Sequence, residues 1–163
     1  MSRALGVDPG ERRVGLAISD EDGVIAQPLS TLTRRGDAQV ASEIAKLVRE
    51  REVATVVVGL ALRLDGSEGE RARRARALVA ALRRAVHDGV DVVTQDERLT
   101  SVAAERALGE AGVREKQRRR EGLTDRVAAA LLLQAFLDER RASLASARVR
   151  AQGGLQGPAE GDR

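Results

Sequence analysis

The sequence contains no cysteine, tryptophan or tyrosine, and Phe136 is its single phenylalanine. Without cysteine there is no disulfide framework and no thiolate zinc site. The core must therefore be built from Val, Leu, Ile and Ala. The scarcity of aromatic side chains also argues against binding of single strands by base stacking, and favours contact with the backbone of structured nucleic acid.

Long apolar runs are absent as well. No run approaches the roughly 20 residues that span a bilayer, and the N-terminal residues "SRALGVDPG" form no apolar signal segment. We therefore expect a cytoplasmic protein with no membrane partner. The 163 residues are enough for one domain with a sizeable core.

Arginine supplies nearly all of the positive charge, and the net charge is +3. Arginine binds phosphate through a bidentate fork, so its abundance favours nucleic acid as a partner. Coding bias alone can also produce a chain rich in Ala and Arg, so position must decide. Five cations fall in the segment 114–122, which leads to an acidic residue discussed below, and we expect them to contact phosphates without reading sequence. They are Arg114, Lys116, Arg118, Arg119 and Arg120.

Apolar periodicity predicts an α/β protein with one mixed five-stranded sheet and helices on both faces. Three strands form an antiparallel meander, and parallel strands that alternate with helices follow. Pro28 places the third strand at an edge. We expect one domain over residues 1–145, and a disordered tail over 146–163 because that segment is rich in Gly, Gln, Ala and Arg. The predicted strands lie within 4–8, 12–20, 23–32, 54–60 and 90–97, and the helices within 36–52, 67–88, 101–112 and 123–144.

Carboxylates occupy three places where apolar residues would be expected. Asp8 ends the first strand, Asp96 and Glu97 follow the last one, and Asp125 lies in the first turn of the final helix. Each has an ordinary explanation: a turn before Pro-Gly, an acidic loop, or an acid favoured by the helix dipole. Together they place acids at one edge of the sheet, where sites of open α/β proteins form.

Clustered carboxylates repel one another, so a cluster at this edge predicts a bound cation. Oxygen-only ligands prefer Mg²⁺ or Mn²⁺. Two such ions roughly 4 Å apart activate a water and stabilise the leaving oxygen of a phosphodiester. We therefore expect a nuclease in which water attacks the phosphorus in line and the 3′ oxygen leaves. The only histidine, His87, is interpreted as a surface or helix-capping residue.

Four motifs over about residues 4–140 resemble the YqgF/RuvX family, Holliday junction resolvases also described as pre-16S ribosomal RNA nucleases. The motifs are "GVDPGERRVGLAISD", "VVVGLALRLDGSEG", "DERLTSVAAERAL" and "DRVAAALLLQAFLD". Two positions depart from the family pattern: Ala61 replaces a proline, and Arg63 replaces a polar amide. Neither involves an acid.

The resemblance implies an RNase H-like fold, with Asp8, Asp96 or Glu97, and Asp125 as catalytic acids. Alternation along the strand does not decide between Asp96 and Glu97; we favour Asp8, Glu97 and Asp125 as metal ligands. The family pattern retains an arginine at Arg13. With Arg12, it lies in the turn beside Asp8 and is expected to hold a phosphate.

Several alternatives stay open at this point. The chain could be a nucleic-acid-binding module that has the fold but does not cut, acting in ribosome maturation or transcription. The hairpin "DPGERRVGLAISD" is also similar to the phosphate-binding hairpin of actin-like proteins, although 163 residues leave room for only one of their two lobes. The sequence leaves undecided whether the substrate is a DNA junction or a ribosomal RNA precursor, and whether the protein is a monomer or a homodimer.

Overall fold

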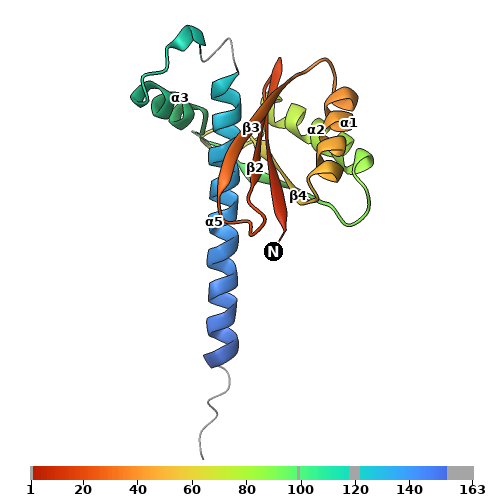
Figure 1. Cartoon of the computed structure of the whole chain (residues 1–163), viewed down its shortest axis with the longest axis vertical. Helices are drawn as coiled ribbons and strands as arrows, with labels where there is room; N and C mark the ends of the chain where they lie inside the picture. The colour runs from red at the N-terminus through yellow and green to blue at the C-terminus, as the bar shows by residue number, and fades with distance from the viewer. Residues whose placement is uncertain (1, 99, 118–121, 154–163) are drawn as a thin grey trace, which may run out of the picture.

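The structure, a computed structural model, describes residues 2–98, 100–117 and 122–153 (Figure 1). Its elements follow the predicted order of three strands followed by alternating helices and strands. They are β1 (Arg3–Pro9), β2 (Arg13–Ser19), β3 (Ala26–Thr33), α1 (Asp37–Glu50), β4 (Val53–Leu60), α2 (Glu70–Ala85), β5 (Asp91–Asp96), α3 (Thr100–Glu110) and α5 (Leu123–Gly153).

The five strands form one mixed sheet in the order β3-β2-β1-β4-β5. The meander β1-β2-β3 is antiparallel, whereas β4 runs parallel to both β1 and β5. This confirms the predicted topology. Strand β3 lies at the edge, as expected from Pro28, and its pairing with β2 shifts register between Leu16 and Ala17. The two parallel pairings bring the carboxyl ends of β1, β4 and β5 to the same edge of the sheet.

Helices cover both faces of the sheet, as predicted. Helices α1 and α2 pack on one face around Leu5, Leu16, Ile44 and Leu78, which are fully buried. Helix α5 crosses the other face, and α3 packs against α5 (Figure 1). A second core cluster on that side joins Ala17 and Val57 to Ala129, Leu133 and Leu137 of α5. Because α5 starts at the edge where β1 ends, its first turn lies beside the carboxyl ends of the central strands.

Helix α5 is longer than predicted. The sequence suggested an end near residue 145, but the helix continues to Gly153, so residues 146–153 are helical and do not belong to a disordered tail. Its last turns are rich in Ala and Arg, which favour helix, and they extend a helix that is already nucleated by packing. The remainder of the expected tail, 154–163, lies outside the described residues.

Two further points concern the helices. The segment 114–122 lies outside all of the predicted helices, yet residues 115–117 are helical. None of the helices in the described part of the chain is long and apolar enough to cross a membrane.

Candidate active site

The side chains of Asp8 and Glu97 meet at the edge where the parallel strands end. Asp8 is the penultimate residue of β1, and Glu97 follows β5 directly. A backbone hydrogen bond from Glu97 N to Leu60 O, 3.2 Å long, anchors Glu97 to the end of β4. Both side chains are buried, with 6% exposure each, and they are hydrogen-bonded to each other.

Gly59 of β4 lies next to the Glu97 carboxyl group and at the level of Asp8 in the sheet. Residue Val7 of β1 pairs with Val58 of β4, so Asp8 and Gly59 follow at the same level of the sheet. A Cβ atom at Gly59 would collide with Oε2 and Cδ of Glu97. The glycine therefore leaves the space in which the Glu97 carboxyl group lies over β4 and reaches Asp8.

Burial and mutual proximity change the acidity of the pair. Burial, the hydrogen bond to Asp8 and the negative charge of Asp8 together raise the pKa of Glu97 to about 9. Burial also raises the pKa of Asp8, against the opposing effects of the hydrogen bond from Glu97 and the positive charge of Arg71. In the absence of a cation, the pair thus retains a proton at neutral pH, carried by Glu97 and donated to Asp8.

Asp125 lies at the same edge, in the first turn of α5. It is half-buried, and its Oδ2 is 3.4 Å from Nε of Arg13 at the start of β2. Burial raises the pKa of Asp125; the charge of Arg13 opposes this, and the charge of Asp8 adds to it. Gly15 of β2, which pairs with Asp8, permits the approach, because a Cβ atom there would collide with the backbone of Asp125.

Asp96 does not join the other acids. Its carboxylate is bound by Arg98, whose Nε lies 2.6 Å from Oδ2 and whose backbone N donates to Oδ1 at 3.0 Å. The structure thus brings Asp8 and Glu97 into contact and places Asp125 nearby, whereas the carboxylate of Asp96 pairs with Arg98 and only its negative charge acts on Glu97, whose pKa it helps to raise. Within the described residues, no three His, Cys, Asp or Glu side chains converge as a ready-made metal cluster.

The donor set nevertheless fits a hard divalent cation. Its ligands would be carboxylate oxygens, which Mg²⁺ and Mn²⁺ prefer. Two buried carboxyl groups that share a proton are also a place where a cation removes repulsion between negative charges. Asp125 would complete the set if its ion pair with Arg13 opened.

The structure describes four of the seven basic residues that were predicted to contact nucleic acid. Arg13 is half-buried and contacts Asp125, whereas Arg12 is exposed in the same turn. Arg114 and Lys116 are exposed as expected. The remaining predicted phosphate contacts, Arg118, Arg119 and Arg120, lie outside the described residues. Arg34 was not predicted; its Nη1 donates to Gly10 O at 2.9 Å and so supports the turn after Asp8.

Arg71 is a second residue that sequence reasoning missed. No role was predicted for it from the sequence, but its positive charge lowers the pKa of both Asp8 and Glu97. The side chain is exposed, in the first turn of α2. Helix periodicity alone shows that Arg71 faces away from the core. Only the pairing of β1 with β4 shows that the first turn of α2 lies beside the acids.

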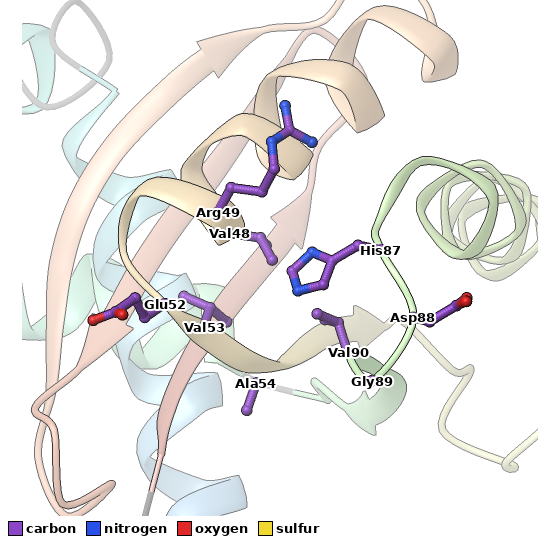
Figure 2. A pocket seen from close by; sticks show the side chains of 9 residues that line it. All are labelled: Val48, Arg49, Glu52, Val53, Ala54, His87, Asp88, Gly89 and Val90. Carbon is purple, nitrogen blue, oxygen red and sulfur yellow. The ribbon is translucent and has the colours of Figure 1, made fainter.

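A cavity at the opposite edge of the sheet lacks comparable chemistry. It has a volume of about 480 Å³ and lies between the end of α1, the start of β4 and the loop after α2. Figure 2 shows His87 and Arg49 among its lining side chains, with Val48 and Val53 forming apolar walls. His87 is exposed and directly follows Val86, the C-cap of α2, which agrees with its interpretation as a surface residue near the end of a helix. It is remote from Asp8, so it contributes nothing to the acidic site.

The chain is similar to known proteins over most of its length. The chain matches the model of the RuvX family, described as Holliday junction resolvase, over residues 2–139. It is 44% identical over 140 residues to a protein of Syntrophus aciditrophicus named "Putative pre-16S rRNA nuclease", covering 83% of this chain and 88% of that protein. A protein of Anaeromyxobacter dehalogenans with the same name is 45% identical over 138 residues, covering 85% and 98%.

Solved structures show the same fold at low sequence identity. The chain superposes on RuvC of Thermus thermophilus in complex with a Holliday junction substrate with a TM-score of 0.55 and 17% identity, covering 86% of this chain and 96% of that one. A resolvase of fowlpox virus, in complex with Holliday junction DNA, gives a TM-score of 0.51 and 9% identity, covering 84% and 97%. The predicted RNase H-like fold is thereby confirmed. From the family match over residues 2–139, we conclude that this chain belongs to the RuvX family.

Proposed function

We propose that the protein is a divalent-metal-dependent endonuclease that hydrolyses phosphodiester bonds in structured nucleic acid. The curated relatives are named for pre-16S rRNA and the family for Holliday junctions, so both are candidate substrates. We place the ribosomal RNA precursor first, because relatives more than 40% identical carry that name. The observation that carries the proposal is the buried, hydrogen-bonded pair Asp8 and Glu97 at the carboxyl edge of the sheet.

Asp8, Glu97 and Asp125 would hold Mg²⁺ or Mn²⁺. When bound, such ions supply an activated water and stabilise the charge that develops on the leaving oxygen. The metal-free pair must first give up the proton that Glu97 donates to Asp8. Asp125 must in turn leave Arg13, whose guanidinium has the donor geometry to contact a phosphate.

The cationic residues around the pair would orient the backbone. Arg13 and Arg12 lie on the β2 side of Asp8, and Arg71 lies on the α2 side. Arg114 and Lys116 add charge on the segment that leads to α5. A substrate phosphate drawn between Arg13 and Arg71 would therefore lie over the two buried carboxyl groups. Such contacts position a backbone without reading its sequence, so we expect the structure of the substrate to determine specificity.

The test uses purified full-length protein, the variant Asp8→Asn, and the matched variant Asp22→Asn, which changes an exposed aspartate of the β2–β3 loop. Each is offered a precursor 16S rRNA fragment and a four-way DNA junction with Mg²⁺, Mn²⁺ or EDTA. We expect metal-dependent cleavage by the wild type and Asp22→Asn, and none by Asp8→Asn. Binding without cleavage by all three proteins would contradict the proposal and indicate a module that does not cut.

A further inference from the structure

The C-terminal part of α5 extends beyond the rest of the protein. Helix α5 has 31 residues, and every residue from 138 to 152 is exposed. Figure 1 shows its last turns projecting past the sheet, on the side opposite the end where α5 begins. We call residues 140–153 the α5 extension. The packing of α5 on the sheet accounts for the first half of the helix and leaves the extension without a structural role.

The α5 extension carries a one-sided charge. It contains Arg140, Arg141, Arg148 and Arg150 and no acidic residue. At 100° per residue, Arg140, Arg141 and Arg148 lie within about 100° of one another on the helix surface. We call these three residues the stripe. Arg141 contacts Asp138 at 2.5 Å, at the very start of the stripe. The stripe therefore presents concentrated positive charge to solvent, as expected of a surface that binds a polyanion.

The apolar residues of the extension do not suggest another partner. Leu144 and Val149 are exposed, with exposures of 45% and 69%. They are five positions apart, so they point about 140° away from each other on the helix surface. A partner helix or a second copy of the chain would need a continuous apolar stripe at three- and four-residue spacing. The charge is thus the feature that identifies the partner.

We propose that the α5 extension binds the phosphate backbone of the same nucleic acid that is cut beside Asp8 and Glu97. This inference rests on the proposed function. Arginine forks contact phosphate oxygens in bidentate geometry, and contacts of this kind add affinity that depends on salt but not on sequence. The extension would then act as a second anchor for one arm of a structured substrate.

The helix sets the distance between the anchor and the site of cleavage. At 1.5 Å per residue, Arg140 is about 22 Å and Arg148 about 35 Å along the helix from Asp125. With 3.4 Å per base pair, these distances correspond to about 7 and 10 base pairs of duplex. An arm shorter than about 6 base pairs cannot reach the stripe from the acidic site, whereas an arm of 15 base pairs passes it.

The experiment compares Arg140→Gln/Arg141→Gln/Arg148→Gln with Arg49→Gln/Arg51→Gln/Arg84→Gln in the full chain. The second triple removes the same charge from exposed arginines of the body. Glutamine favours helix at the five positions that lie in helices, and Arg51 is the exposed C-cap of α1. Binding of branched duplexes with arms of 5 or 15 base pairs is measured by fluorescence anisotropy in EDTA, from 50 to 200 mM salt. Circular dichroism checks that both triples remain folded.

For the long-arm substrate, we expect the extension triple to bind about tenfold or more weakly at 0.1 M salt, with a log–log salt slope smaller by about 3. The body triple should bind like the wild type, and neither triple should affect short-arm binding. Unchanged long-arm binding, an equal loss in the body triple, or an equal loss with short arms would overturn the inference. So would a loss of binding to phosphatidylserine vesicles without any change in duplex binding.

Cleavage of the short-arm substrate separates this inference from the proposed function. If the wild type cuts it with Mn²⁺ and the extension triple binds long arms normally, only the second anchor is refuted. If no substrate is cut, the nuclease itself is refuted, and the inference that rests on it fails as well.

Discussion

The carboxyl group of Glu97 donates a hydrogen bond to that of Asp8, although the two residues lie at opposite ends of the sheet-forming sequence. Their contact depends on the central position of β4, which pairs with β1 on one side and β5 on the other. Gly59 of β4 leaves the space between them. The pair should therefore make the stability of the protein depend on pH and on divalent cations, and should make cleavage sensitive to a methyl group added at position 59.

Metal-free protein should lose stability as the pH rises, because Glu97 retains its proton in the folded state. Its pKa is raised from 4.5 to about 9, so between these values the folded protein binds more protons than the unfolded chain. Glu97→Gln removes this dependence. In EDTA at pH 8 the variant should melt a few degrees above the wild type, by about 2–4 °C for each kcal/mol. At pH 4.5 the difference should disappear. Parallel pH–Tm curves for the two proteins would contradict the assigned proton.

Divalent cations should stabilise the wild type through the acidic site. A ligand at 100 times its Kd adds about 2.7 kcal/mol to the free energy of unfolding. Mg²⁺ or Mn²⁺ should therefore raise the Tm of the wild type and of Asp22→Asn, but not of Asp8→Asn. Thermal scans with increasing metal concentration provide the measurement. An equal rise in Asp8→Asn would place the cation elsewhere.

A single methyl group at position 59 should abolish cleavage. The Cβ of Gly59→Ala would occupy the space of the Glu97 carboxyl group and displace it from Asp8. We expect a loss of activity of 100-fold or more and a destabilisation of about 1–3 kcal/mol from overpacking. Gly36→Ala is the matched control, because a Cβ at Gly36 meets nothing within 4 Å. The measurements are the cleavage rates of both variants and their free energies of unfolding in urea. Full activity in Gly59→Ala would be inconsistent with the assigned role of Glu97.

Arg71 should contribute to phosphate binding. Its charge acts on both buried acids from the first turn of α2, whereas Arg73, two residues further on, is exposed and has no such effect on either acid. Arg71→Gln should raise KM about tenfold, since a hydrogen bond to a charged group contributes about 1.5–3 kcal/mol. Arg71→Lys should restore part of the loss, and Arg73→Gln should behave like the wild type. Steady-state kinetics provide the measurement. If Arg71→Gln changes neither KM nor kcat, Arg71 does not contribute to the site.

Much of the fold was predictable because its local signals agree with its tertiary structure. The apolar run of β4 indicates a strand buried on both faces, and Pro28 marks β3 as an edge strand. The acids were recognisable as residues that end strands. What sequence patterns do not contain is the distance between elements. Arg71 acts on both buried acids because strand pairing places α2 near β1. The carboxylate of Asp96 is bound by Arg98 and acts on Glu97 only through its negative charge.

The end of α5 was mispredicted for a different reason. Residues 146–153 have a composition typical of a solvated tail, with no apolar periodicity that requires packing. They are helical because alanine and arginine favour helix and because the preceding turns, held by Leu133 and Leu137, already form it. Cooperative extension of this kind leaves little trace in a hydrophobic pattern.

The most direct test compares two neighbouring acids under single-turnover conditions. Glu97→Gln and Asp96→Asn each remove one negative charge, but only Glu97 contacts Asp8. With Mn²⁺ and a precursor 16S rRNA fragment, we expect Glu97→Gln to cut at least about 1,000-fold more slowly than the wild type, since activation of the water and stabilisation of the leaving oxygen both depend on the ions it would hold. Asp96→Asn should stay within a few-fold of the wild type. Equal rates for the two variants would contradict the assignment of the buried pair as the catalytic centre.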